Sequence, residues 1–399
     1  MSEQSVRVVV TGLGCVTCLG HNVDDFWRSL RENRTGLSRI SRFDPTGLRN
    51  EIAGEVKEFA SSEPHDRAVQ FALATAQETL TDSGLSETPS EHAQSGVVCS
   101  TNFGGADSGE QYLTSLRAGM PDPRLWTEFQ FNHASTVIAE RFGFYGPASL
   151  LSLSCSSGTA AIGLAMDWIR SDRAKVMLAG GHDSLSYSSL AGLSILRTIT
   201  AEQIRPFDKR RSGTIFGEGA AMLVLEELGH AQARGAHIYA EVRGYAVNNN
   251  AYHLTAPDKG GAGLRWALQF ALDDARCRPE ELDYINAHGT GTPYHDVAET
   301  LAIKTVLGDH AYRLPISSIK PALGHIMGGA GTVEAIATIL AMRDGIVPPT
   351  LNYEEPDPEC DLDYVPHQAR PHQARCAVSI SSGIGGNNAA VVLRRWEQA

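Results

Sequence analysis

The chain has 399 residues and a formal net charge of −12, because 46 aspartates and glutamates outnumber 34 lysines and arginines. A chain of this length predicts two domains or two fused halves. The acidic balance argues against a nucleic-acid-binding protein, which usually has an excess of basic residues. Hydrophobic residues at 42% and charged residues at 20% are ordinary for a globular protein and exclude a mainly disordered chain.

The sequence also bears on the compartment. No run approaches the roughly 18 apolar residues that a membrane helix needs. Residues 1–7 carry a glutamate and no apolar core, unlike a signal peptide. The 7 cysteines are odd in number and scattered, which favours a reducing cytoplasm over a disulfide framework. We therefore expect a cytoplasmic protein that binds neither membrane nor nucleic acid.

The predicted strands and helices alternate, which is the pattern of an α/β fold. The first half is expected to contain, in chain order, a strand at 6–11, a helix at 67–83, strands at 95–100 and 150–154, a helix at 157–170 and a strand at 175–180, and to end at 220–226. A polar, helix-like segment at 227–236 resembles a connector, so we divide the chain into halves at 1–236 and 237–399. The second half is expected to contain, by type, strands at 239–245, 283–287, 377–381 and 389–394, and helices at 263–275, 296–307 and 331–343.

The segment 151–158, Leu-Ser-Leu-Ser-Cys-Ser-Ser-Gly, leads from an apolar strand through Cys155 into an amphipathic helix. A helix start would place the Cys155 thiol beside unpaired backbone N–H groups and the positive end of the helix dipole, which favour the thiolate. A thiolate attacks carbonyl carbons, so Cys155 is a candidate nucleophile. The alternative is a buried cysteine that packs as a small hydrophobic residue.

A second motif, Asn-Ala-His-Gly-Thr-Gly-Thr-Pro at 286–293, follows a predicted strand. His288 is a candidate acid, base or hydrogen-bond donor to an oxyanion. Thr290 and Thr292 are candidates to hydrogen-bond an amide-rich ligand. The alternative is a loop histidine that only caps backbone groups, which the two Gly-Thr pairs make less favoured.

A further histidine, His325, lies in a glycine-rich stretch between Lys320 and Glu334. These two residues are candidates for a charge pair around it, although each alone is more simply a solvated surface residue. A glycine-rich turn at 381–388, Ser-Ser-Gly-Ile-Gly-Gly-Asn-Asn, joins the last two strands. It would offer a backbone N–H to an oxyanion, or form only a tight hairpin.

Patterns for other ligands are incomplete. The segment 12–17 has Thr17 where the dinucleotide-binding motif needs a third glycine. The cysteines at 15 and 18 have no second pair to complete a zinc site. The histidines at 288, 295 and 325 lack the i, i+4 spacing of ligands on one helix. We therefore expect no metal site.

Together and in this order, Cys155, the His288 motif, Lys320 with His325, and the Gly-Ile-Gly-Gly turn resemble the β-ketoacyl-acyl-carrier-protein synthases of the Cys-His-His branch. The resemblance extends from 8–14, Val-Val-Val-Thr-Gly-Leu-Gly, to the last strand. It implies the thiolase fold, in which two similar βαβαβαββ halves form five αβαβα layers. Priming synthases of the Cys-His-Asn branch fit less well, because His325 stands where asparagine is needed, and thiolases would carry a second cysteine in the last glycine-rich loop.

The activity that the resemblance implies has two stages. An acyl chain passes from the phosphopantetheine of an acyl carrier protein to Cys155, and a malonyl group on a carrier then loses carbon dioxide and condenses with it. Such condensations extend fatty acids or type II polyketides. No bound cofactor is implied, since phosphopantetheine arrives on the carrier. The implied assembly is a homodimer or a heterodimer with a paralogous subunit.

The resemblance also implies roles for individual residues. His288 and His325 would donate hydrogen bonds to the enolate formed by decarboxylation, and the backbone N–H groups of Cys155 and Ile384 would form the oxyanion hole. Thr290 and Thr292 match the positions that bind pantetheine in the family. The family's supporting charged positions, which orient the histidines, correspond here to Lys320, Asp296, Glu299 and Glu334.

The chain departs from the family pattern at three places. Ile384 replaces a phenylalanine that usually gates the acyl pocket, and Asn387 stands where threonine is usual. The segment 61–67 lacks the basic cluster of housekeeping synthases, so an acidic carrier is expected to dock on other cations, which we predict to be Arg205, Lys209, Arg210 and Arg211. We expect an enzyme of a specialised pathway with its own carrier or partner subunit.

Two other functions compete with a condensing enzyme. One is a non-catalytic partner subunit similar to the chain-length factors, which usually lack the cysteine. The other is an acyltransferase or hydrolase that uses Cys155 without decarboxylation. The presence of Cys155 together with His288 and His325 argues against both.

Overall fold

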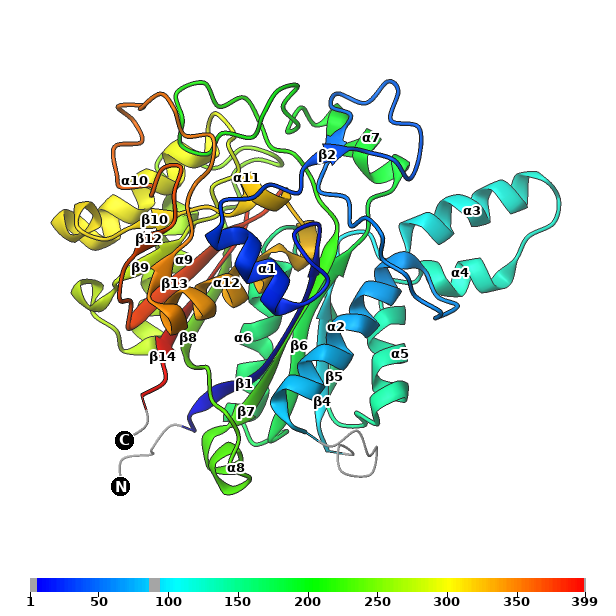
Figure 1. The fold of residues 1–399 in the computed structure, drawn as a ribbon, viewed down its shortest axis with the longest axis horizontal. Helices are drawn as coiled ribbons and strands as arrows, with labels where there is room; N and C mark the ends of the chain where they lie inside the picture. The colour runs from blue at the N-terminus through cyan, green and yellow to red at the C-terminus, as the bar shows by residue number, and fades with distance from the viewer. Residues whose placement is uncertain (1–5, 86–93, 398–399) are drawn as a thin grey trace.

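The computed structural model describes residues 6–85 and 94–397 (Figure 1). Residues 1–5, which belong to the segment read above as unlike a signal peptide, lie outside the described residues. None of the helices in the described part is long and apolar enough to cross a membrane.

The elements alternate as expected for an α/β protein. The first half contains β1 (Val8–Thr17), α1 (Val23–Arg31), β2 (Ser38–Arg39), β3 (Ile52–Ala53), α2 (Arg67–Ser83), β4 (Gly96–Ser100), α3 (Ala106–Arg117), α4 (Pro123–Phe129), α5 (His133–Phe142), β5 (Ala148–Leu151), α6 (Ser157–Arg170), β6 (Val176–Asp183), α7 (Tyr187–Ile195), β7 (Gly219–Glu227) and α8 (Leu228–Ala233). The second half contains β8 (Ala240–Asn249), α9 (Ala262–Ala275), β9 (Tyr284–Asn286), α10 (His295–Leu307), β10 (Ile316–Ser317), α11 (Lys320–Leu323), α12 (Ala330–Asp344), β11 (Ile346–Val347), β12 (Arg370–Pro371), β13 (Cys376–Ser382) and β14 (Asn387–Arg395). In the described part of the chain, short 3₁₀ turns lie at 279–281, 308–312 and 327–329.

The main sheet has the same strand order in its two halves. Among the described residues ten strands are hydrogen-bonded in the order β10-β9-β13-β14-β8-β1-β7-β6-β4-β5. Each half, counted in its own chain order, therefore reads 3-2-4-5-1 from its outer edge. The halves meet where β1 and β8 pair antiparallel, over only three residue pairs from Val8↔Val242 to Val10↔Ala240. Two similar halves, as the thiolase fold requires, are confirmed.

Helices form three layers around these two half-sheets. Helices α6 and α12 pack on each other and on strands of both halves, so they lie between the half-sheets (Figure 1). Helices α2 and α5 pack on the first half, whereas α9 packs on β8 and β14 of the second and α10 packs on α9. The five-layer arrangement predicted from the resemblance is therefore present. Every residue of α12 from Ala330 to Met342 is buried, because strands cover the helix from both sides.

Strand β1 shows why the glycines at 12 and 14 are needed. The strand was predicted to end at residue 11 but continues through both glycines to Thr17. A Cβ atom on Gly12 would lie 2.4 Å from the backbone oxygen of Thr79, and one on Gly14 would lie 2.2 Å from Thr79 Oγ1. Helix α2 thus packs directly on the strand backbone. This contact, and no nucleotide, accounts for the glycine pattern.

Other boundaries agree or differ for local reasons. Helices α2 and α6 have the predicted bounds. Strand β5 ends at Leu151 although the prediction extended to 154, because the chain turns there and Ser154 adopts a left-handed φ of 57°. Helices α3 to α5, which we did not predict, form an insertion before β5, and α3 and α4 project from the body of the molecule (Figure 1).

Candidate active site

Four predicted site residues converge from loops that are far apart in the sequence. Cys155 follows β5, His288 follows β9, His325 precedes α12 and Ile384 follows β13. All four line one cavity of about 410 Å³. The fold therefore brings together the thiol, both imidazoles and the glycine-rich turn that the sequence singled out.

Cys155 lies at the start of α6 and is 7% exposed. Burial raises the pKa of its thiol; the Ser154 hydroxyl, Lys320 and the backbone N–H of Ile384 oppose this shift. The groups that favour the thiolate are thus the Ser154 hydroxyl, Lys320 and the Ile384 N–H, whereas the sequence pointed to the N–H groups and dipole of the helix start. Burial outweighs them, so the thiolate that the helix start was expected to favour is not the resting form, and the cysteine is a thiol that must lose its proton before it attacks.

His325 has a defined tautomer. The backbone N–H of Met327 donates to its Nδ1 at 3.2 Å. The proton of the neutral ring is then on Nε2, which has no hydrogen-bond partner among the described residues. Burial, with Lys320, lowers the pKa of His325 well below its ordinary value. The ring is therefore neutral, with one unpaired N–H buried beside the cavity.

His288 is fixed in the same way by a lysine. The Nζ atom of Lys320 donates to the backbone oxygen of His288 at 2.5 Å and lies 3.4 Å from His288 Nδ1. Burial and this cation lower the pKa of His288 well below its ordinary value. With Nδ1 facing a donor, the proton is on Nε2. The two imidazoles lie with ring centroids 5.4 Å apart.

Lys320 and Glu334 form a buried ion pair, as the sequence suggested. Their side chains are 1% and 3% exposed. Burial raises the pKa of Glu334 and the lysine opposes this shift. The surface alternative for these residues is therefore wrong. Since Lys320 also contacts His288, the pair links α12 to the catalytic loop.

Asp296 and Glu299 hold the backbone of the His288 loop. Glu299 accepts hydrogen bonds from the backbone N–H groups of His288 at 2.6 Å and Gly289 at 2.9 Å. Asp296 accepts from Phe207 at 2.7 Å and from the N–H of residue 291. Burial raises the pKa of Glu299 to about 8 and that of Asp296 to about 6. Both carboxyls position the loop through its backbone, and neither faces the cavity.

Two cavities meet at Cys155. The first, which contains the histidines, is also lined by Thr290 and Thr292, whose Oγ1 atoms are 3.2 Å apart. The second, of about 500 Å³, has mostly apolar walls that include Phe103 and Leu193, with several serines also among its lining residues. Cys155 and Ile384 line both. A substrate attached at the thiol can thus extend in two directions.

His295 is a cavity residue to which the sequence assigned no catalytic role. Its ring lies 4.9 Å from that of His288, and burial lowers its pKa to about 4. Both ring nitrogens are buried without a hydrogen-bond partner in the described part of the chain. The only available signal was a third histidine close to the His288 motif. A metal ion shared by these histidines would face the positive charge of Lys320, which disfavours it.

The predicted docking cations are not free charges. Arg211 pairs with Asp357 at 2.5 Å, and Lys209 pairs with Glu355 at 3.3 Å. Arg205 and Arg210 both pair with Glu354. An acidic segment at 354–357 therefore neutralises this cluster, and the structure gives no reason to assign carrier docking to it.

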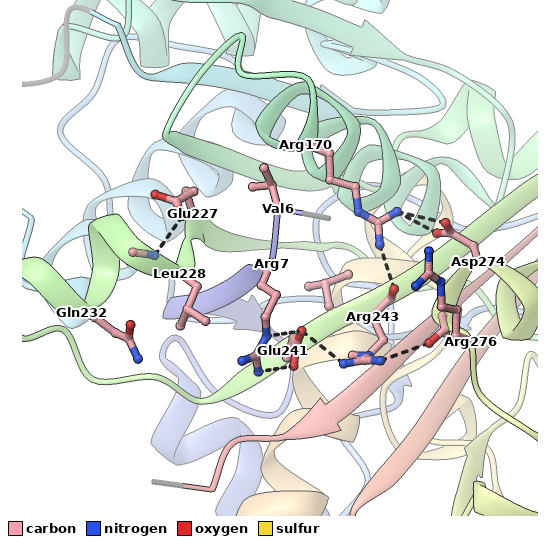
Figure 2. A pocket seen from close by; sticks show the side chains of 13 residues that line it. Val6, Arg7, Arg170, Glu227, Leu228, Gln232, Glu241, Arg243, Asp274 and Arg276 are labelled. Atoms are coloured by element: carbon pink, nitrogen blue, oxygen red, sulfur yellow. Dashed lines mark hydrogen bonds and ion pairs between the residues drawn. The ribbon is translucent and has the colours of Figure 1, made fainter. Parts of the chain in front are cut away.

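A larger hollow, of about 790 Å³, lies away from these residues (Figure 2). It is found where β1 begins and where β7 and α9 end, and most of its charges pair with one another. Arg7 binds Glu241, and Arg170 binds Asp274. None of the predicted site residues lines it.

A buried thiol flanked by two imidazoles and by backbone N–H groups belongs to enzymes that form acyl-cysteine intermediates. The chain belongs to the beta-ketoacyl synthase family. The model of the family's N-terminal domain matches residues 5–231, and that of its C-terminal domain matches residues 239–354. The protein is a condensing enzyme of the acyltransferase type.

Similar proteins come from two kinds of pathway. A putative polyketide beta-ketoacyl synthase 1 of Streptomyces halstedii is 42% identical, over 98% of each chain. A 3-oxoacyl-[acyl-carrier-protein] synthase 2 of Synechocystis is 41% identical, also over 98% of each chain. One solved structure is a type II PKS acyl-carrier protein in complex with its ketosynthase. A chain of that structure is 34% identical to this protein, with a TM-score of 0.93, and the match covers 99% of this protein and 100% of that chain.

Proposed function

We propose that this protein elongates acyl chains by transferring them from an acyl carrier protein to Cys155 and condensing them there with a malonyl group. The observation that carries this proposal is the position of Cys155 between two cavities, one with two imidazole donors and one with apolar walls. The first suits a thioester on pantetheine and the second suits a hydrocarbon chain.

In the first stage, the Cys155 sulfur gives up its proton and attacks the thioester carbonyl carbon. The carbonyl oxygen becomes an oxyanion, for which the N–H groups of Cys155 and Ile384 are the donors. The intermediate collapses with cleavage of the bond to the pantetheine sulfur, which takes up a proton and leaves. Loss of one such donor typically costs about 3 kcal/mol of transition-state stabilisation.

In the second stage, the malonyl thioester loses its carboxylate as carbon dioxide. The electron pair of the broken bond forms an enolate, whose oxygen accepts from Nε2–H of His288 and of His325. The enolate carbon then attacks the acyl carbonyl on Cys155, and the cysteine sulfur leaves as thiolate. Neutral imidazoles with fixed tautomers suit this role, because they donate without releasing a proton.

The carrier protein is both substrate and partner in this proposal. Thr290 and Thr292 would bind the amides of its phosphopantetheine arm, so no resident cofactor is required. The name of the solved ketosynthase complex with an acyl-carrier protein supports this partner.

Relatives named for polyketide and for 3-oxoacyl synthesis support both fatty acid and type II polyketide elongation as pathways. For this chain we favour a specialised pathway with its own carrier. Normal elongation with the housekeeping carrier of the cell would contradict that choice.

We further propose a dimer, formed with a second copy or with a paralogous subunit. The projecting α3–α4 segment exposes apolar side chains, namely Leu113 at 55%, Leu116 at 50%, Met120 at 75% and Trp126 at 50%. The solved ishigamide ketosynthase/chain length factor is 36% identical with a TM-score of 0.93, which supports the heterodimer as one option. Light scattering on the purified chain separates the options, since a homodimer needs no other subunit.

The location that we propose is the cytoplasm. All seven cysteines are free thiols, which suits a reducing compartment. Fractionation of cells that express the natural protein checks this, and recovery from outside the cytoplasm would contradict it.

Intact-protein mass spectrometry tests the function. We expect the wild-type chain to gain an acyl mass from acyl carrier thioester and to lose it as a β-ketoacyl product when malonyl-carrier is added. The Cys155→Ala variant should gain no mass. An acyl mass that malonyl-carrier does not discharge would instead indicate a non-condensing acyltransferase, or a subunit that needs its partner.

The variant His288→Ala separates the two stages. Acyl loading should largely persist, because the oxyanion hole of that stage uses backbone N–H groups. Decarboxylation of malonyl-carrier should fall by 10²–10³-fold, roughly the effect of losing one oxyanion donor. Equal losses in both stages would contradict the roles assigned here.

A further inference from the structure

A cluster of metal-ligating side chains lies outside the active site. The Nδ1 atom of His65 is 2.9 Å from Glu128 Oε1, and the Nε2 atom of His133 is 3.0 Å from the same oxygen. One donor atom from each residue lies within 4.8 Å of the others. Two imidazoles thus converge on one carboxylate oxygen, and none of the catalytic roles proposed above involves them.

The spacing of these atoms fits a zinc ion. Zn²⁺ is held by nitrogen and oxygen ligands at about 2.0–2.1 Å in tetrahedral geometry, which places neighbouring ligand atoms roughly 3.3 Å apart. The two nitrogen–oxygen distances are close to that value. Small rotations of the three side chains would open the space for an ion, and the ring protons would move to the nitrogens that face away.

The backbone around the cluster is already fixed. Glu128 Oε2 accepts the backbone N–H of Asp66 at 2.8 Å, and Gln70 Nε2 donates to the backbone oxygen of His65 at 2.9 Å. The side chains of His65, Glu128 and His133 are 21%, 15% and 14% exposed. The ligands are therefore held in place and largely shielded, while solvent can still reach the site.

We propose that His65, Glu128 and His133 bind one Zn²⁺ ion, with a fourth position left for water. The three ligands come from the loop before α2, from α4 and from the first turn of α5. The ion would join the base of the projecting α3–α4 segment to the body of the molecule. It has no part in the condensation, so this inference does not depend on the proposed function. This proposal departs from the sequence-based expectation of no metal site, which was drawn from the cysteines at 15 and 18 and the histidines at 288, 295 and 325.

Calorimetric titration of Zn²⁺ into the EDTA-treated full chain tests the site. The measurement uses the Cys155→Ala background, which removes the active-site thiol as a competing zinc ligand. We expect one ion per chain. The zinc affinity of H133N should fall by more than the 10–100-fold that is typical when a residue hydrogen-bonded to a metal ligand is removed. The control H230N removes a histidine that is also paired with a carboxylate, that of Glu226, and should leave the affinity unchanged.

A second measurement needs no substitution. In the unmodified chain, Zn²⁺ should protect His65 and His133 from diethyl pyrocarbonate, while exposed histidines elsewhere react at the same rate with and without the ion. If H133N unfolds, E128Q replaces it in the titration, because glutamine keeps the shape of the side chain. Equal zinc affinity in the variant and its parent, or no protection of the two histidines, would overturn the proposal.

Discussion

The side chain of Ile384 is the one we expect to influence which acyl chains the enzyme accepts. It lines both cavities at Cys155 and packs with Leu193, Phe216 and Met327 on the apolar side. The oxyanion-hole role that we propose for its backbone N–H does not depend on the side chain. The side chain therefore sets the passage from the thiol to the apolar cavity without changing the chemistry.

We predict that Ile384→Phe narrows this passage. Loading of long acyl chains should slow at least tenfold, about 1.4 kcal/mol, whereas acetyl loading should change little because an acetyl group does not enter the apolar cavity. Rates of acyl-enzyme formation across a series of chain lengths measure this. The control is Ile384→Leu, which conserves volume. A uniform loss at all lengths would show that Ile384 does not select chain length.

His182 on β6 allows a pH prediction that is separate from catalysis. The side chain is 1% exposed, its Nδ1 has no partner within the described residues, and burial lowers its pKa to about 4. Because the folded pKa lies below the unfolded value near 6.5, the unfolded state binds more protons between these values. The contribution to stability is therefore complete above pH 6.5 and is lost as the pH falls toward 4.

The measurement is the free energy of unfolding in urea at pH 7.5 and at pH 5.5. The wild-type chain should lose about 1.3 kcal/mol more over this interval than His182→Asn, which has no titrating ring. The comparison cancels the contributions of other buried groups, including carboxyls with raised pKa values, which act in the opposite sense. Parallel changes in the two proteins would contradict the assigned pKa shift.

At the scale of elements, two helical glycines test the packing of the middle layer. A Cβ atom on Gly163 of α6 would lie 1.9 Å from the ring of Tyr245 on β8, whereas one on Gly192 of α7 would meet no atom within 4 Å. The ring of Tyr245 cannot move freely, since its hydroxyl donates a hydrogen bond to Asp167 of α6.

We predict that Gly163→Ala destabilises the protein by about 1–3 kcal/mol through overpacking. Gly192→Ala should be neutral or should stabilise by up to about 1 kcal/mol, because alanine loses less entropy in a helix. Urea unfolding of both variants gives the comparison. If the two changes had the same effect, the close approach of α6 to β8 would not limit residue size.

How deeply each helix is buried explains how clearly the sequence indicated it. Helices such as α2 and α6 were predicted with correct bounds, because apolar residues at helical spacing mark both and Gly84 marks the end of α2. Helix α12 was predicted at 331–343 and spans Ala330–Asp344, and it has no polar face because both half-sheets cover it. Helices α3 and α4 were missed, since few of their residues are buried and the apolar periodicity is weak.

At the scale of the whole molecule, the mouth of the catalytic cavity offers a cation that the sequence did not single out. Arg197 is exposed, lines this cavity, and forms no ion pair with any described residue. By contrast, the acids at 354–357 neutralise the cluster near Lys209. An acidic carrier would therefore be attracted more by Arg197 than by that cluster.

We predict that Arg197→Glu lowers kcat/KM for acyl-carrier substrate by roughly tenfold at low salt, and less at high salt because ions screen the charge. Acylation by a free pantetheine thioester should be unaffected. Lys209→Glu reverses a charge of the same size and should have a smaller effect. A larger loss for Lys209→Glu would instead support the docking surface predicted from the sequence.

The sequence by itself determined the order and identity of the reactive groups. A cysteine before a helix, a histidine after a strand with two Gly-Thr pairs, and a second histidine with Lys320 are local patterns, and local backbone rules place each at an element's end. Their joint occurrence predicted the family and the fold. The alternation of elements predicted an α/β protein, and the five layers were predicted from the family resemblance.

The tertiary structure alone decided the states of those groups. Burial made Cys155 a thiol, and contacts from Met327 and Lys320 fixed the protons of the two imidazoles. Contacts between distant segments paired the predicted docking cations with acids and brought His65 to His133. Proton positions, pKa values and free charges depend on neighbours that are close in space but distant in the chain, so no local pattern encodes them.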